Sequence, residues 1–112
     1  MARLYNIGAE LEREHCHNAI SGGALVAMRG AGSKCYSKEN KYKIDTIFIY
    51  KDKIVLAQHK KRGIIKKKDL ASLIELQNLI PIIEVCVGSS DKLMNVKELA
   101  GELFGKRVRA HP

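Results

Sequence analysis

The chain has 112 residues, of which 46% are apolar and 29% charged, and it contains only two prolines. This length and composition predict one globular domain over residues 1–112, and they exclude both an extended disordered chain and a protein with a membrane-spanning apolar segment. Twenty Lys and Arg residues outnumber twelve Asp and Glu residues, and the net charge of +8 favours a polyanionic partner, with nucleic acid first.

The first half of the chain predicts a helix followed by three strands. The helix runs from Asn6, which would cap it, to about Ile20, and the small residues that follow end it. Residues 24–29 are an apolar run that predicts a strand, and residues 30–42, rich in Gly, Ser, Lys and Asn, predict a loop. The β-branched runs 43–50 and 54–60 then predict a β-hairpin.

The second half predicts two helices around one strand. Residues 69–79 predict a helix with one face formed by Leu70, Leu73, Ile74 and Gln77. Residues 82–87 predict a strand, and residues 95–104 predict a final helix. This order of elements predicts an α/β fold, in which a small mixed β-sheet is flanked by helices.

The predicted hairpin brings three polar side chains toward one end of an apolar face. Gln58 and Lys60 share a face of the second strand, because side chains alternate along a strand. A two-residue loop at residues 51–52 would pair Asp45 with Gln58, and one at residues 52–53 would pair Asp45 with Lys60. A three-residue loop would separate them, unless a bulge restored the register.

An acid, an amide oxygen and an ammonium group are what a divalent metal needs to hydrolyse a phosphodiester. Carboxylate and amide oxygens hold Mg²⁺ or Mn²⁺, and the metal activates the attacking water. A nearby ammonium group orients that water or stabilises the charge of the transition state. The alternative is that Asp45 and Lys60 form an ordinary cross-strand ion pair.

The N-terminal helix contributes another carboxylate. Glu12 lies in a stripe of small residues, Ala9, Cys16 and Ala19, that would let the helix approach the sheet closely. A carboxylate on such an inward face needs a partner or a metal. The alternative is a salt-bridged residue at the margin of the helix.

Two further patterns concern the environment and the partner. The N-terminus lacks an apolar signal core, and the three widely spaced cysteines form no C-x-x-C pair, so we expect an intracellular protein with reduced thiols and no structural zinc. Basic residues cluster in two places, at 60–68 and at 106–109, and aromatic residues are few. These clusters indicate binding through backbone phosphates rather than base stacking. The alternative is a solvated basic surface.

Several of these segments, taken together, resemble the archaeal-type Holliday junction resolvases, cellular or viral, a branch of the PD-(D/E)xK nuclease superfamily. The resemblance covers about residues 5 to 80, and it rests on the order and spacing of the motifs Gly8-Ala9-Glu10-Leu11-Glu12-Arg13-Glu14, Arg29-Gly30-Ala31-Gly32-Ser33-Lys34, Ile44-Asp45 and Gln58-His59-Lys60. It implies a restriction-endonuclease-like core and a metal-dependent endonuclease that cleaves four-way DNA junctions.

The resemblance also implies roles for individual residues. The expected catalytic residues are Glu12, Asp45, Gln58 and Lys60, with Glu12, Asp45 and Gln58 holding Mg²⁺ or Mn²⁺. Arg13, Arg29 and Ser33 match positions that touch the DNA, and Lys34, Lys61, Arg62, Lys66, Lys67 and Lys68 complete the expected DNA-binding set. The family further implies a homodimer on branched double-stranded DNA, in the cytoplasm of a prokaryotic cell or of a virus-infected host.

The chain departs from the family in two places. Residues 35–43 are longer than the usual link between the serine and the aspartate, and they add three lysines. Gln58 stands where the family has Glu, which removes one negative charge from the metal site. A natural variant that still cleaves, a relative that only binds junctions, and an engineered Glu-to-Gln change at position 58 all explain this glutamine.

Rival functions and the oligomeric state also stay open. A nuclease of the same superfamily could act on mismatched or flapped duplex, and a small RNA-associated protein would explain the charge alone. The apolar set Leu70, Leu73, Ile74 and Leu76 would either seal a homodimer or pack in the core of one chain.

Overall fold

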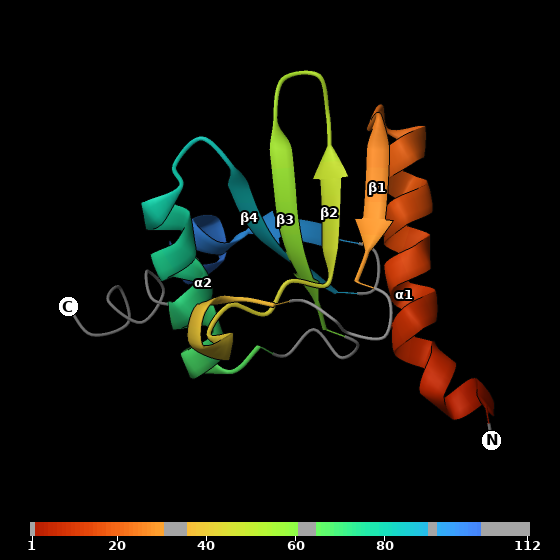
Figure 1. Cartoon of the computed structure of the whole chain (residues 1–112), viewed down its shortest axis with the longest axis horizontal. Helices are drawn as coiled ribbons and strands as arrows, with labels where there is room; N and C mark the ends of the chain where they lie inside the picture. Colours follow the sequence, from red (N-terminus) through yellow and green to blue (C-terminus); the bar gives the residue numbers. More distant parts are fainter. Residues whose placement is uncertain (1, 31–35, 61–64, 90–91, 102–112) are drawn as a thin grey trace.

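The computed structural model describes residues 2–30, 36–60, 65–89 and 92–101 and contains a five-stranded sheet between helices (Figure 1). The strands are β1 (Val26–Arg29), β2 (Thr46–Ile49), β3 (Ile54–His59), β4 (Glu84–Ser89) and β5 (Lys92–Asn95), and they are hydrogen-bonded in this order. β3 and β4 are parallel, and the other neighbouring pairs are antiparallel. The predicted α/β fold with a small mixed sheet is therefore confirmed.

Helix α1 (Ala2–Ser21) covers one face of the sheet. Its Ala19 packs with Phe48, Val55, Ala57 and Cys86, which are all buried. Small side chains on this part of the helix let its backbone approach the strands closely. The predicted inward stripe is correct for Cys16 and Ala19, and the side chain of Ala9 lies outside the described residues.

Helix α2 (Lys67–Leu79) covers the opposite face and carries the chain from β3 to β4 (Figure 1). A parallel pair of strands needs such a crossover. Leu70 and Leu73 are buried against Val85, Val87 and Val96 of the second core. The predicted apolar face of this helix is confirmed.

Gln77 is a polar residue on that face. It can be buried because its amide group makes hydrogen bonds that satisfy it. Its Nε2 donates to the carbonyl oxygens of Ile83 at 2.5 Å and Ile80 at 3.3 Å. Its Oε1 accepts from the Val85 amide at 2.8 Å and from Asn95 Nδ2 at 3.0 Å. One side chain thus joins the end of α2 to β4 and β5.

The leucines and isoleucine proposed for a dimer interface serve the core of this chain. Leu70 and Leu73 are buried, and Ile74 and Leu76 are partly buried against the same cluster. Of the two alternatives, the structure therefore supports core packing for this set. Homodimerisation stays a prediction.

The observed elements differ from the predicted ones mainly after α2. β4 begins two residues later than predicted, and the sequence pattern did not predict β5 at all. Residues 96–101 are helical, and Asn95 Oδ1 caps this turn by accepting from the Lys97 amide at 2.9 Å. Asn95 therefore marks the predicted start of the last helix and also ends a strand.

Within the described part of the chain, no helix combines the length and the apolar character needed to cross a membrane. Cys16 and Cys86 are free thiols, as expected, and Cys35 lies outside the described residues.

Candidate functional site

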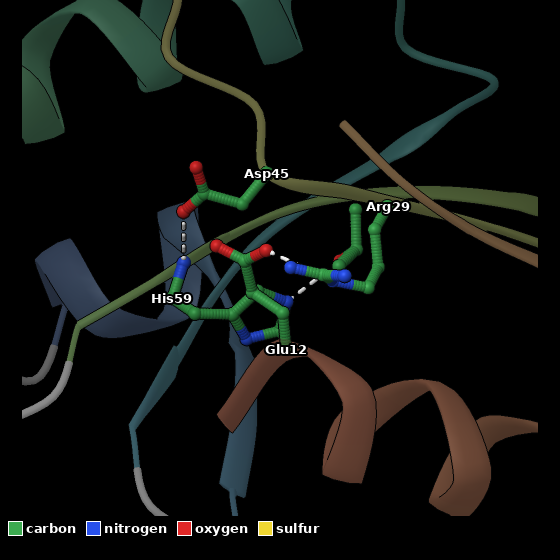
Figure 2. Close-up of polar contacts among 5 residues, drawn as sticks. Glu12, Arg29, Asp45 and His59 are labelled. Atoms are coloured by element: carbon green, nitrogen blue, oxygen red, sulfur yellow. Dashed lines mark hydrogen bonds and ion pairs between the residues drawn. The ribbon is translucent and has the colours of Figure 1, made fainter. Parts of the chain in front are cut away.

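Polar and charged side chains gather at the end of the sheet that lies away from the β2–β3 hairpin turn. Arg29 is the last residue of β1, Asp45 directly precedes β2, and His59 is the last residue of β3. Glu12 reaches this end from α1 (Figure 2). Four segments that are distant in sequence therefore supply one cluster.

The hairpin has the two-residue loop that would align Asp45 with Gln58. The Tyr50 amide donates to the Lys53 carbonyl at 2.8 Å, and Thr46 pairs with Ala57. At Asp45, however, the ladder changes, because the Asp45 amide also donates to the Ala57 carbonyl, at 2.8 Å. Two residues thus oppose one, which is the pattern of a β-bulge and turns a side chain away from its regular direction.

The bulge places Asp45 beside His59 and Glu12 instead of in a regular pair with Gln58. Asp45 Oδ2 accepts from the His59 amide at 2.9 Å, as Figure 2 shows. With this loop a regular alternation would set Asp45 opposite Gln58, and the ladder departs from that alternation at Asp45. Of the registers that the sequence left open, the hairpin has the one with the loop at residues 51–52, and a local bulge changes the ladder at Asp45.

Glu12 is partly buried and paired with Arg29. Arg29 Nε donates to Glu12 Oε1 at 3.3 Å, and the two side chains are 26% and 19% exposed. Figure 2 shows the carboxylate of Glu12 between Arg29 and Asp45. The expectation that Glu12 faces inward is confirmed. The alternative, that Glu12 forms a salt bridge, is also observed, because Glu12 pairs with Arg29. Both descriptions hold at once.

Both carboxylates are harder to ionise than free carboxylates, chiefly because they are part-buried. Burial raises the pKa of Glu12 above 4.5, and the charge of Asp45 raises it further, against the lowering effect of Arg29. Burial also raises the pKa of Asp45 above 3.8, although the His59 amide and the charge of Lys60 lower it in part. Part-buried acids with perturbed pKa values cluster at functional sites.

The side chain of His59, next to the two carboxylates, is held in place by contacts with its neighbours. Its Nε2 lies 2.6 Å from Thr46 Oγ1, and its ring lies 4.4 Å from the ring of the buried His15. A Cβ atom on Gly88 would lie 2.7 Å from its Nδ1, so the ring packs against a strand that has no side chain there. Burial lowers the pKa of His59 to about 4, with a smaller contribution from His15, and His59 is neutral at pH 7.

Gln58 is buried, with 4% of its surface exposed. It pairs with Val87, whose side chain belongs to the core under α2, so alternation along β3 directs Gln58 toward that layer. Its Oε1 accepts no hydrogen bond from any described residue. A buried amide oxygen without a donor is costly, and it can accept a cation or a water molecule.

Lys60 lies between the site and α2. Its charge acts on Asp45, and its Nζ lies 3.7 Å from Asp69 Oδ2. The expected proximity of Asp45 and Lys60 is therefore observed. Asp69, which the sequence did not single out, is the ion-pair partner of Lys60.

The remaining residues of the expected DNA-binding set are partly described. Arg13, Lys66, Lys67 and Lys68 are exposed, whereas Arg29 is half-buried against Glu12. Ser33, Lys34, Lys61 and Arg62 lie outside the described residues, as does the basic C-terminal cluster.

The sequence analysis also missed His15, Thr46 and His59. His15 lies three positions after Glu12, so helical periodicity alone could have placed it on the inward face. The contact between His15 and His59 joins residues 44 positions apart, and no local pattern predicts it.

The oxygen atoms at this end of the sheet fit a hard divalent cation. Glu12 and Asp45 each bring a carboxylate, and Gln58 Oε1 is a buried oxygen that has no donor among the described residues. No group of three or more His, Cys, Asp or Glu side chains suitable for a metal occurs in the described part of the chain. Mg²⁺ is commonly bound by one or two carboxylates with substrate phosphate and water, and it does not need such a group.

Comparison with models of known protein families, with curated proteins and with solved structures finds no match to the chain.

Proposed function

We propose that this chain is a metal-dependent endonuclease that hydrolyses phosphodiester bonds of branched DNA, with four-way junctions as its substrate. The observation that carries the proposal is the pair of part-buried carboxylates, Glu12 and Asp45, which come from different elements and whose pKa values burial raises, with the charge of Asp45 acting on Glu12 and that of Lys60 acting on Asp45. The resemblance to Holliday junction resolvases supports the substrate, and the net charge of +8 suits DNA.

In this proposal the chain binds Mg²⁺ or Mn²⁺ through Asp45 and Glu12, and Gln58, directed toward the layer of α2, occupies the position that the resemblance gives to a third oxygen ligand. The cation supplies Lewis acidity at the scissile phosphate and lowers the pKa of the attacking water. Arg29 orients the Glu12 carboxylate, and the His59 amide orients that of Asp45. Lys60 stabilises the negative charge that develops on the phosphate.

A junction-binding protein without catalysis is the second candidate, because two observations favour it. Gln58 brings no negative charge to the site, and Lys60 forms an ion pair with Asp69. Such a protein would use the same surface to bind junctions and would leave them intact. We further propose that the chain acts as a homodimer, because paired sites suit paired incisions.

The test is a cleavage assay on a synthetic four-way junction, with Mg²⁺ or Mn²⁺ and with a linear duplex as the control substrate. Loss of a second-shell partner typically costs 10- to 100-fold in activity, so removal of a ligand in Asp45→Ala should cost more than about 100-fold. Asp52→Ala, which removes an exposed carboxylate at the hairpin turn, is the matched control and should cleave normally.

Gln58→Glu separates the two candidates. If the chain as written cuts junctions, the binding-only protein is excluded. If only Gln58→Glu cuts, the glutamine has switched off a nuclease site and the second candidate is correct. If neither variant cuts, or if the chain binds junctions no better than linear duplex, the proposed function is overturned.

A further inference from the structure

A basic groove lies between η2 (Lys38–Asn40) with the residues that follow it and the first turns of α2. Its volume is about 390 Å³. The lysines that line it are Lys41, Lys43, Lys66 and Lys68. We propose that this groove binds the phosphodiester backbone of one DNA strand and leads it to Lys60. The inference rests on the proposed function, and it adds a binding site next to the candidate active site.

The charges of the groove favour an anion. Four lysines face two acids, Glu39 and Asp69, among the residues that line it. Lys41 also forms an ion pair with Glu75, with 2.5 Å between Nζ and Oε2. Lys66 and Lys68 are exposed and form no ion pair with a described residue, so they are free to meet a phosphate.

The start of α2 adds to this preference. Lys66 is the N-cap residue of the 13-residue helix, and its side chain makes no capping hydrogen bond. The amides of a helical first turn lack partners within the helix, and the helix dipole favours negative charge there. Phosphate oxygens are acceptors that suit such a position.

Asp69 links the groove to the candidate active site. Its Oδ1 lies 3.7 Å from Lys43 Nζ in the groove, and its Oδ2 lies 3.7 Å from Lys60 Nζ. The side chain is only 13% exposed, so it is a fixed bridge between the two ammonium groups. A strand whose phosphates occupy the groove would therefore meet Lys60 next.

The lining also indicates which part of the nucleic acid is bound. Among the described residues, no aromatic side chain lines the groove, so it offers no platform for stacked bases. Lysines contact phosphates as point charges and read no base sequence. We therefore expect binding that depends on salt and not on DNA sequence.

The experiment measures binding of a fluorescent four-way junction by anisotropy, without divalent metal so that no cleavage occurs, over a range of salt concentrations. Lys66→Gln with Lys68→Gln should weaken binding about tenfold or more, and it should lower the salt slope by roughly two, because each phosphate contact contributes about 0.9. The charge-matched control is Lys51→Gln with Lys53→Gln at the hairpin turn, which should leave both quantities close to those of the unmodified chain.

Asp69→Asn gives a test of opposite sign. It removes the acid that competes with phosphate for two lysines, so the junction should bind several-fold more tightly and not more weakly. Circular dichroism of each variant checks that it is folded, and a gain in affinity cannot come from unfolding.

The outcomes distinguish the groove from the nuclease activity. If the groove variant binds like its control and Asp69→Asn gains nothing, the groove proposal is overturned even when junctions are cleaved. If the groove variants behave as expected but no variant cuts DNA, the groove stands and the nuclease proposal fails. A double-stranded RNA competitor that displaces the junction as well as unlabelled junction does would overturn the assignment to DNA.

Discussion

Replacement of Gly88 by alanine should force the His59 ring out of its place and destabilise the fold. A Cβ atom at this position would lie 2.7 Å from His59 Nδ1 and 2.8 Å from Leu93 Cδ2. Leu93 is 37% exposed and its methyl group ends a flexible side chain, so it can swing away at little cost. The histidine ring cannot, because His15 and Thr46 hold it on its other sides.

The size of the effect follows from this difference between the two neighbours. Overpacking of a well-packed site typically costs about 1–3 kcal/mol. For a domain of this length, 1 kcal/mol corresponds to roughly 4 °C in the melting temperature, so Gly88→Ala should lower Tm by roughly 4–12 °C. The measurement is thermal unfolding followed by circular dichroism.

Two comparisons make the measurement specific. Gly101→Ala is the same substitution in helical residues 96–101, where a Cβ atom would meet nothing within 4 Å, and it should be neutral or stabilising by up to about 1 kcal/mol. In a His59→Ala background, Gly88→Ala should lose most of its cost, because the ring that it strikes is gone. That coupling should amount to about 1 kcal/mol or more.

The reasoning is refuted if Gly88→Ala melts at the temperature of the unmodified chain. It is also refuted if its cost is the same with and without the His59 ring, because the strain would then lie elsewhere. A loss of junction cleavage in a folded Gly88→Ala protein would extend the effect to the site, since the His59 amide holds Asp45.

Two further predictions concern charge and buried polarity. Burial raises the pKa of Asp45 in the folded state, so its charged form costs stability above that pKa, and the cost disappears as the pH falls below 3.8. Asp45→Asn should therefore melt at a higher temperature than the unmodified chain at pH 7, with a difference that shrinks toward pH 3, and a lower Tm at pH 7 would contradict it. Gln77→Ala should cost roughly 2–3 kcal/mol in urea unfolding, because it leaves buried backbone groups of Ile83 and Val85 without partners, while Asn78→Ala on the exposed face of α2 should change little. Equal midpoints for these two variants would refute the role of Gln77.

Local pattern in the sequence determined most of the elements and part of the site. The 3.6-residue period of α2 placed Leu70, Leu73 and Gln77 on its buried face, and the two β-branched runs predicted the hairpin but left the length of its loop open. Glu12 was expected to face inward because its neighbours along the helix are small. These predictions hold because each depends on residues close together in the chain.

Only the tertiary structure decided where β5 lies and where Asp45 points. β5 has four residues and no strong alternation, and it is a strand because the edge of β4 is free to pair with it. The bulge at Asp45 depends on how two strands meet, and the carboxylate of Asp45 there accepts a hydrogen bond from the His59 amide.

The contacts that support the site also depend on the tertiary structure. His15 and His59 meet across α1 and β3, and Asp69 bridges Lys43 and Lys60 across three segments. Periodicity reports which face of an element a residue occupies, and it does not report which residue of another element comes to lie opposite. The sequence therefore determined that Glu12, Asp45 and Lys60 belong near one end of the sheet. The packing of α1, β4 and α2 around that end decided which side chains hold them there.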